Sequence, residues 1–380
     1  MIKQILKTTA AVCTFGFMPV AGVMAQSAND VLQVIYKVND HWINRHSPEV
    51  TPFWHQAVYQ TGNMEAYKLT KKKDYRDFAE RWAEHNKWSG ATGNDKSKWK
   101  YSYGETPEFV LFGDWQCCFQ TYADLYKADP APGKIARAKE VMEYAMSLPH
   151  TNYWWWADAL YMAMPVMSKY YKLTGNKEYL NKMYVYFKYA DDLMYDRTEH
   201  FYYRDRRYVW PKHKSLNGKK DFWARGDGWV LAGLAKVLQD TPKKWEHYPF
   251  FKLRFQQLAE AARKSQQPEG FWSRSILDEP FAPGYETSGT ALFTYGMLWG
   301  INNGLLKRSD YDAVVRKAWT YLSTIALQPD GVVGYVQPIG DRAIPGQVIN
   351  AKSEQDFGTG AFLLAACEMQ RYLSKKSGGK

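Results

Sequence analysis

The sequence predicts an all-α protein, a closed toroid of helical hairpins in a single domain. Helical periodicity runs through most of the chain, whereas convincing alternation of apolar and polar residues is scarce. A short pattern also recurs at residues 73–75, 177–179 and 309–311, where Lys or Ser, then Asp or Glu, then Tyr opens a helix. Each of these helices follows another helix closely, so the repeating unit is a helical hairpin. A curved, open solenoid of helix pairs is the alternative.

The helices are expected where an apolar stripe recurs with helical spacing. In the three repeated segments the acidic residue suits a helix N-terminus, and the Tyr begins the stripe. Phe201 to Val209 is the best candidate for a short β-hairpin. In a toroid, inner helices start at one rim, and loops rich in Trp, Tyr, Arg and Asp are expected to line its mouth. In chain order, the predicted helices are residues 29–45, 64–84, 109–127, 133–148, 157–173, 176–194, 227–239, 250–265, 287–304, 309–326 and 356–374.

Residues 1–25 have the composition of a cleavable signal peptide. Lys3 and Lys7 supply positive charge, the following residues to Val23 are mostly small and apolar, and Ala25 ends a suitable cleavage site. We therefore expect residues 26–380 to form one soluble domain in the periplasm or outside the cell. The apolar run is short for a membrane span, and no later segment approaches the required length, so no membrane insertion is expected.

Charge and composition favour a carbohydrate partner. Two of the 50 basic side chains lie in the leader, which leaves 48 against 39 acidic ones, a net charge of +9. This balance favours anionic partners, but the basic residues are dispersed and match no nucleic-acid-binding motif. An acidic glycan is the more natural partner of an exported protein. Aromatic residues make up 16% of the chain, with 16 Trp and 28 Tyr, which exceeds the needs of a core and supports a sugar site.

The cysteines and histidines do not predict a metal site. Cys117, Cys118 and Cys367 show no CxxC or zinc-like spacing, and no HExxH pattern is present. We expect the three cysteines to be buried apolar residues, and we expect neither a metal nor another cofactor.

The segment Trp154-Trp155-Trp156-Ala157-Asp158 is the most informative stretch of the chain. It places one carboxylate among three tryptophans at the apparent start of a helix. Stacked aromatic rings hold the apolar faces of sugars, and a poorly solvated carboxylate has a raised pKa, as a general acid needs near neutral pH. The alternative is a core helix whose first turn carries Asp for the helix dipole.

Further segments contain candidate substrate contacts. Trp223-Ala224-Arg225-Gly226-Asp227-Gly228-Trp229 sets a guanidinium between two indoles, which suits a carboxylate and a sugar ring. Its alternative is a helix start with Asp227 as the cap and the two tryptophans in the core. Asp114 is either a second carboxylate of the site or an ordinary helix-capping residue. Arg204 lies in an aromatic, basic stretch that forms either one wall of a subsite for an anionic sugar or an exposed turn. Glu286 is expected mainly to cap a helix.

In order along the chain, six segments resemble the unsaturated glycuronyl hydrolases, particularly glycoside hydrolase family 105. No single segment is decisive, but their order makes the resemblance specific. The segments are Trp54–Ala57 with Gly62–Met64, Asp114–Gln116 with Gln120–Tyr122, Trp156–Met162 with Pro165, Arg225–Trp229, Glu286–Ser288, and Gly358–Leu364.

The resemblance implies an (α/α)6 toroid that removes a 4,5-unsaturated uronic acid from the non-reducing end of lyase-generated oligosaccharides. It implies that Asp158 is the general acid/base, protonating C4 of the enol ether while water adds at C5. Asp114 then orients the substrate or Asp158. It further implies that Trp223, Arg225 and Trp229 hold the uronyl ring. Trp156, His150 and Arg204 are additional candidate substrate contacts, of which His150 does not match the spacing of the family's upstream His. Asp227 and Tyr203-Arg204-Asp205 depart from the family, many of whose members have Asn and a His-containing segment there.

Two other functions remain open. A polysaccharide lyase of the same fold creates the double bond instead of consuming it, and more often carries a Tyr/His or Asn/His pair. A non-catalytic protein that binds acidic glycans is a different class with the same aromatic rim. The oligomeric state is not predicted.

Overall fold

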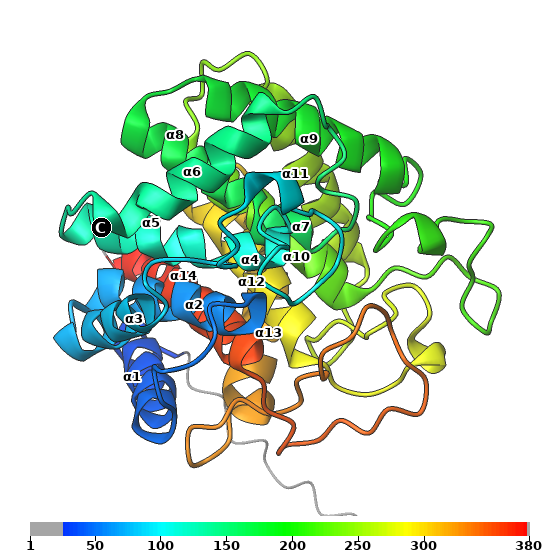
Figure 1. Cartoon of the computed structure of the whole chain (residues 1–380). Coiled ribbons are helices and arrows are strands. Elements are labelled where there is room, and N and C mark those ends of the chain that lie inside the picture. Colours follow the sequence, from blue (N-terminus) through cyan, green and yellow to red (C-terminus); the bar gives the residue numbers. More distant parts are fainter. Residues whose placement is uncertain (1–25, 378–380) are drawn as a thin grey trace, which may run out of the picture.

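The computed structural model describes residues 26–377, so the predicted signal peptide at residues 1–25 lies outside the described residues. Within them the chain forms two concentric rings of helices (Figure 1). Each inner helix packs on the next, and the last packs on the first, which closes the ring. This closure confirms the predicted toroid and excludes the open solenoid. The inner helices are α2 (Trp54–Thr70), α5 (Cys118–Ala128), α8 (Met164–Thr174), α10 (Ala224–Asp240), α12 (Thr287–Asn302) and α14 (Asp356–Ser377).

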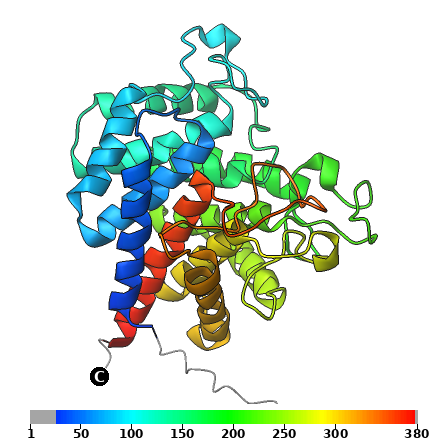
Figure 2. The ribbon, with the colours of Figure 1, turned by 90° about the horizontal axis from the view of Figure 1, so that it is seen from below.

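The outer helices cover the inner ring. Viewed from below, α1 lies beside α14 (Figure 2), and each other outer helix packs on the inner helix that precedes it. The repeated Asp/Glu-Tyr pattern opens three of these outer helices, and its tyrosines Tyr75, Tyr179 and Tyr311 are buried. The hairpin repeat is therefore confirmed. The outer helices are α1 (Ala28–Arg45), α3 (Lys73–His85), α6 (Gly133–Ser147), α9 (Glu178–Met194), α11 (Tyr248–Lys264) and α13 (Arg308–Tyr321).

The structure corrects several predicted elements. The single helix predicted at residues 64–84 is wrong, because Lys71 adopts a left-handed conformation (φ 60°) that ends α2 and separates it from α3. The β-hairpin predicted at Phe201–Val209 is also wrong. Tyr202 and Asp205 each form one antiparallel bridge to another segment, and the chain then turns into the 3₁₀ helix η2 (Arg206–Tyr208).

Two predicted helices are each divided into a short and a long helix. Residues 109–127 contain α4 (Gly113–Gln116) before α5, and residues 157–173 contain α7 (Ala159–Met162) before α8. Both short helices lie near the centre of the ring in Figure 1. The remaining short elements are η1 (Lys96–Lys98), η3 (Glu279–Phe281) and the π-helical turn η4 (Leu322–Ala326).

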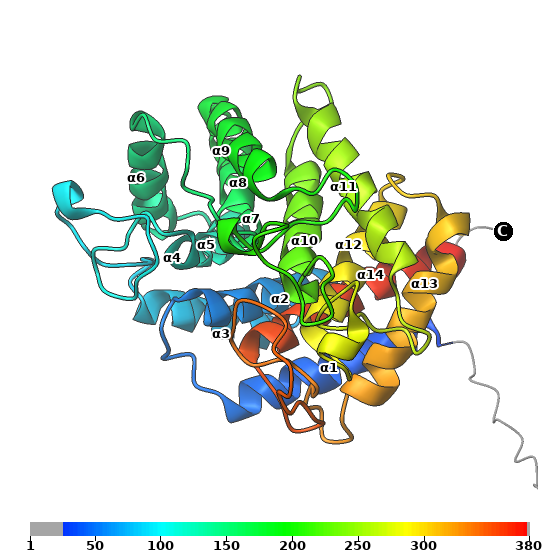
Figure 3. The ribbon, with the colours of Figure 1, turned by 90° about the vertical axis from the view of Figure 1, so that its right-hand side faces the viewer.

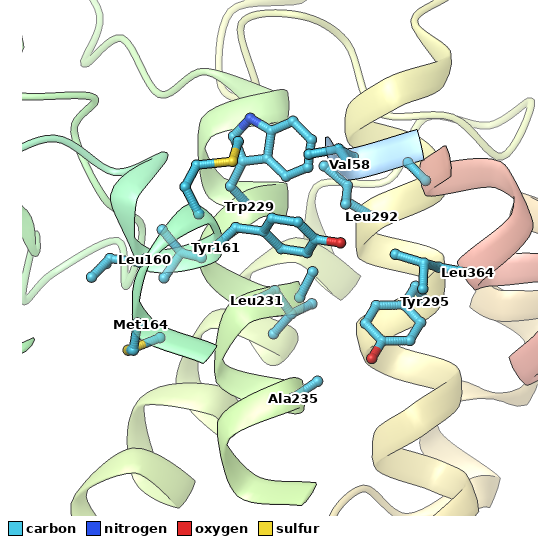
Figure 4. Close-up of a cluster of buried hydrophobic side chains, with 14 of the residues drawn as sticks. Val58, Leu160, Tyr161, Met164, Trp229, Leu231, Ala235, Leu292, Tyr295 and Leu364 are labelled. Atoms are coloured by element: carbon cyan, nitrogen blue, oxygen red, sulfur yellow. The ribbon is translucent and has the colours of Figure 1, made fainter. Parts of the chain in front are cut away.

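The core lies between the inner helices. Trp229 of α10 and Leu292 of α12 converge there with Tyr161 of the short helix α7 (Figure 4). Glycine allows the closest approach: a Cβ on Gly233 of α10 would lie 1.9 Å from the carbonyl oxygen of Leu160 in α7. Substituting this glycine would therefore displace α7, which follows Asp158 directly.

The three cysteines are free and buried, as predicted. None of the helices within residues 26–377 combines the length and apolar character that crossing a membrane requires.

Candidate active site

A cleft of about 700 Å³ opens at the end of the toroid where inner helices begin. Its side chains are mainly aromatic, acidic or basic, as expected for the mouth of the ring. Four acids (Glu105, Asp114, Asp158 and Asp341) face two arginines (Arg204 and Arg207). The lining residues come from segments 53–55, 103–105, 112–114, 155–162, 204–207 and 339–341.

Asp158 lies at the inner part of the cleft with only 9% of its surface exposed. One carboxylate oxygen, Oδ2, is buried without a hydrogen-bond partner, and Nε of Arg204 lies 3.4 Å from it. Burial raises the pKa of Asp158, while the positive charges of Arg204 and Arg225 oppose that rise. The pKa therefore shifts in the predicted direction and for the predicted reason, poor solvation.

Local backbone pairing places Asp158 and Arg204 together. Trp156 and Asp205 form an antiparallel bridge, and the N–H of Ala157 donates to the carbonyl of Arg204 at 2.8 Å. Asp158 occupies the position before α7, yet its side chain makes no capping hydrogen bond. The carboxylate is thus held in the cleft by its backbone and is not used as a helix cap.

Asp114 is the second buried carboxylate of the cleft. It lies on α4, is 7% exposed, and lines the same cavity as Asp158. Burial raises its pKa well above the ordinary Asp range, the negative charge of Asp158 raises it further, and Arg204 opposes the shift. The charges of both Asp158 and Arg204 therefore act on the Asp114 carboxyl group.

The three consecutive tryptophans have different environments. Trp154 is buried away from the cleft and packs on Tyr186, with ring centroids 5.4 Å apart. Trp155 and Trp156 both line the cleft, and Trp156 stacks on Phe112 at 4.7 Å with an interplanar angle of 25°. Trp155 is partly exposed and Trp156 is 1% exposed, so Trp155 offers most of the indole surface that a sugar ring next to Asp158 could contact.

A charged network supports the wall that carries Arg204. Arg204 donates through Nη1 to Asp205 at 2.7 Å, and Arg207 also donates to Asp205. Arg207 further donates to Asp341 at 3.1 Å, as does the hydroxyl of Tyr208 at 3.0 Å. This network joins the segment before α10 to the segment before α14 across one side of the cleft.

Trp223, Arg225 and Trp229, which were predicted to contact substrate, do not line the cleft. Trp229 is fully buried and packs against Trp54 and Tyr161. Trp223 is 3% exposed and stacks on the Arg225 guanidinium, 4.5 Å from its ring centroid. Their placement fits the alternative interpretation, in which the tryptophans belong to the core.

Arg225 nevertheless supports the cleft from behind. It donates to the carbonyl oxygens of Gln337 at 2.6 Å and Pro338 at 2.9 Å, directly before the cleft residues 339–341. Burial lowers its pKa to about 10.

Asp227 lies inside α10, where it accepts the N–H of Tyr202 at 2.7 Å and does not cap the helix. Glu286, by contrast, caps α12 as predicted.

His150 also lies outside the cleft. It is exposed, and its ring lies next to those of Tyr101 and Tyr153, at centroid distances of 5.5 and 6.1 Å. Trp156, Asp114 and Arg204 are therefore the predicted substrate contacts that the structure brings together with Asp158.

The sequence analysis assigned no role to His55, Tyr103 or Glu105, all of which line the cleft. His55 lies in the first turn of α2, and its Nδ1 is 2.6 Å from Oδ2 of Asp356 in the first turn of α14. These two residues are 301 positions apart. Only ring closure brings them together, so no local pattern could identify the pair.

The arrangement suits acid/base chemistry on a bound sugar. A buried carboxyl group that retains its proton at higher pH can act as an acid, and the adjacent Arg204 can stabilise the carboxylate that forms. Indole faces supply a platform for an apolar sugar face, and the guanidinium suits an anionic group on the ligand.

The chain is similar to known glycoside hydrolases along most of its length. The family model described as Glycosyl Hydrolase Family 88 matches residues 26–373. A curated relative from Formosa agariphila, named unsaturated 3S-rhamnoglycuronyl hydrolase, is 34% identical over 332 residues, which are 83% of this chain and 84% of the relative.

Solved structures are similar along most of the chain. One, described as glycosyl hydrolase family 88 from Bacteroides vulgatus, is 56% identical with a TM-score of 0.90, covering 91% of this chain and 100% of that one. Another, named a polysaccharide lyase, is 60% identical with a TM-score of 0.89, covering 91% and 98%. A family 105 glycoside hydrolase from C. acetobutylicum, 20% identical with a TM-score of 0.70 over 89% and 98%, shares the fold.

The resemblance to these hydrolases is thus confirmed at the level of the family. The chain belongs to Glycosyl Hydrolase Family 88 and is a glycosidase.

Proposed function

We propose that this enzyme removes a 4,5-unsaturated uronic acid from the non-reducing end of oligosaccharides produced by polysaccharide lyases. The observation that carries the proposal is the buried, incompletely hydrogen-bonded carboxyl group of Asp158 beside Arg204 in an aromatic cleft. The curated relative named as an unsaturated rhamnoglycuronyl hydrolase supports the same substrate class.

In the proposed mechanism, Asp158 first donates its proton to C4 of the enol ether. The C4=C5 electron pair forms the new C–H bond, and positive charge develops at C5 and the ring oxygen. Water then attacks C5 while the Asp158 carboxylate accepts a proton from that water, which restores the acid. The hemiketal formed at C5 opens and releases the remaining sugar. No second carboxylate has to act as a nucleophile, unlike in the usual glycosidase.

The neighbouring groups have distinct roles in this proposal. Arg204 stabilises the Asp158 carboxylate after proton transfer and attracts the carboxylate of the uronyl ring. Trp155 and Trp156 contact the ring, and Asp114 shares the proton of the acid pair and orients the substrate. Because both acids are buried, the site retains a proton at a pH at which an exposed Asp would be ionised.

The decisive test is Asp158→Asn assayed on unsaturated disaccharides. Turnover removes the conjugated double bond, so its ultraviolet absorbance should fall with the wild-type enzyme. Loss of the general acid should reduce the rate by about 10²- to 10⁴-fold while substrate binding persists. Asp341→Asn is the matched control, since it also lines the cleft but makes no contact with Asp158. An unchanged rate in Asp158→Asn would refute the mechanism.

A lyase is the second candidate, because one structure 60% identical to this chain is named a polysaccharide lyase. A lyase removes a proton from C5 and creates the double bond, so the same absorbance would rise on an intact polysaccharide. The sign of the absorbance change therefore separates the two reactions.

We also propose that the protein is exported to the periplasm or the medium. Residues 1–25 have the composition of a signal peptide, with Ala25 before the expected cleavage point. The mature protein isolated from its native cells should then begin at Gln26, which mass spectrometry of the intact chain would test.

A further inference from the structure

A second cavity of about 690 Å³ lies beside the cleft, and the chemistry proposed above makes no use of it. It is bounded by the C-terminal end of α3, by the loop between α3 and α4, and by Arg137 and Glu140 of α6. In Figure 3 this loop, in cyan, extends away from the ring next to α4 and α6. We call the cavity the outer hollow.

The outer hollow and the cleft share a thin wall. Glu105 lines both cavities. Pro52 lines the outer hollow while the next residue, Phe53, lines the cleft. Likewise, Trp115 lines the outer hollow while the preceding residue, Asp114, lines the cleft. The rings of Phe53 and Trp115 pack at a centroid distance of 4.6 Å, so one layer of aromatic side chains separates the cavities.

The position of Asp158 determines which way a substrate extends. Only the terminal unsaturated ring has to reach Asp158, so the rest of the oligosaccharide must leave the cleft across its exposed rim. Tyr103 and Glu105 lie on that rim: Tyr103 is 61% exposed and donates to the Glu105 carboxylate at 2.8 Å. A chain that crosses the rim at Glu105 enters the outer hollow.

The lining of the outer hollow suits uncharged sugars. Arg137 and Glu140 form an ion pair of 2.8 Å, and Arg137 also holds the loop through the carbonyl of Gly93 at 2.6 Å. Lys87 and Glu105 line the hollow with opposite charges, so its Lys, Arg and Glu side chains balance. Thr92 and Asn94 expose a hydroxyl and an amide. Together with the indole of Trp115, these groups form the mixture of apolar surface and a few polar contacts that ligand sites use.

The backbone of the loop is held in a defined shape. Lys87 and Trp88 are consecutive non-glycine residues with left-handed φ angles of 52° and 55°. Their N–H groups donate to the carbonyls of Glu84 and Ala83 at the end of α3. Such conformations persist where surrounding contacts impose them, so the backbone is fixed at the point where the loop leaves α3, on the side of the hollow that Lys87 lines.

We propose that the outer hollow is a distal subsite for uncharged sugars on the reducing-end side of the unsaturated uronic acid. The enzyme therefore favours oligosaccharides longer than a disaccharide. This inference rests on the proposed function, because it takes the non-reducing end of the substrate to lie at Asp158.

The test compares an unsaturated disaccharide with an unsaturated tetrasaccharide whose two added sugars, on the reducing-end side, are uncharged. For the wild-type enzyme, kcat/KM should be about three- to tenfold higher on the tetrasaccharide, as one or two added hydrogen bonds would produce. The double variant Thr92→Ala/Asn94→Ala should lose this advantage and keep the wild-type rate on the disaccharide. Asn94→Trp, which fills the hollow, should have the same effect. Asn181→Ala, on the exposed face of α9, is the control and should retain the advantage.

Equal kcat/KM values for the two lengths in the wild type would overturn the proposal, as would an advantage that survives both variants. If neither oligosaccharide is consumed, the proposed function has failed, and the subsite is then tested by calorimetric binding to Asp158→Asn. Tighter binding of the tetrasaccharide that the Thr92/Asn94 changes abolish would support the distal subsite. Binding independent of length would refute it.

Discussion

Replacing Arg204 with Gln should move the basic limb of the pH–kcat/KM profile to higher pH. Nε of Arg204 lies 3.4 Å from Oδ2 of Asp158, and its charge opposes the rise in pKa that burial produces. Without this cation, the positive charge of Arg225 and a backbone hydrogen bond still oppose the effect of burial. Asp158 should then keep its proton to a higher pH, so the active, protonated enzyme persists further into the basic range.

The structure sets the size of this effect. Two unit charges at 3.4 Å interact by about 5 kcal/mol at an effective dielectric constant of ~20, which is an upper bound. Shifts caused by one neighbouring opposite charge are about 1 to 3 pH units, and we expect a shift in this range for Arg204→Gln. The plateau value of kcat should fall, because the carboxylate formed after proton transfer loses its counter-ion.

The assay is the loss of double-bond absorbance, measured as kcat/KM across the pH range. Arg207→Gln is the matched control: it removes a guanidinium from the same wall, but Arg207 pairs with Asp205 and Asp341 and not with Asp158. Its basic limb should stay close to that of the wild type. If Arg204→Gln leaves the limb in place or moves it to lower pH, Asp158 is not the group that Arg204 controls.

Three further predictions concern the residues around the acid pair. Gly233→Ala should lower the free energy of unfolding by about 1–3 kcal/mol, since its Cβ would lie 1.9 Å from a backbone oxygen of α7. Thermal denaturation measures this change. The control is Gly133→Ala, whose Cβ would have no atom within 4 Å and which should leave the free energy of unfolding nearly unchanged. Arg225→Met should raise KM about tenfold and change kcat less, because the loop at Gln337 loses its anchor; an unchanged KM would contradict this role. Asp114→Asn should raise the melting temperature at neutral pH but not in acid. The folded-state pKa of Asp114 lies above its unfolded value, so folded protein binds more protons, and stability falls as pH rises between the two values. A lower melting temperature of this variant at neutral pH would refute that reasoning.

Local patterns in the sequence predicted the elements better than their boundaries. The acidic residue and Tyr that open α3, α9 and α13 identified the outer helices, because a helix N-terminus and an apolar stripe are both local features. The break at Lys71 was missed, since a left-handed Lys carries no composition signal of the kind that Gly would provide. The predicted hairpin at 201–209 failed because Tyr202 pairs with Tyr195 and Asp205 with Trp156, both outside the predicted hairpin.

Sequence patterns likewise identified some residues of the site and misplaced others. The Asp158 block was identified because one carboxylate among indoles is unusual at any position, and Arg204 because a basic, aromatic stretch is equally visible. Arg225 and Trp229 have the composition of a sugar site, yet they lie behind the cleft, because a sequence pattern does not specify which side of a helix start faces the ring axis.

The sequence by itself determined the all-α toroid and the family, and it predicted the acid at Asp158, because periodicity, segment order and a carboxylate among aromatic rings can all be read along the chain. Only the tertiary structure decided which side chains meet. Ring closure brings His55 to Asp356, the bridge between Trp156 and Asp205 puts Arg204 next to the acid, and the loop after α3 forms a second hollow beside the first. These contacts join segments that are far apart in the chain, and their geometry depends on how the helices close-pack.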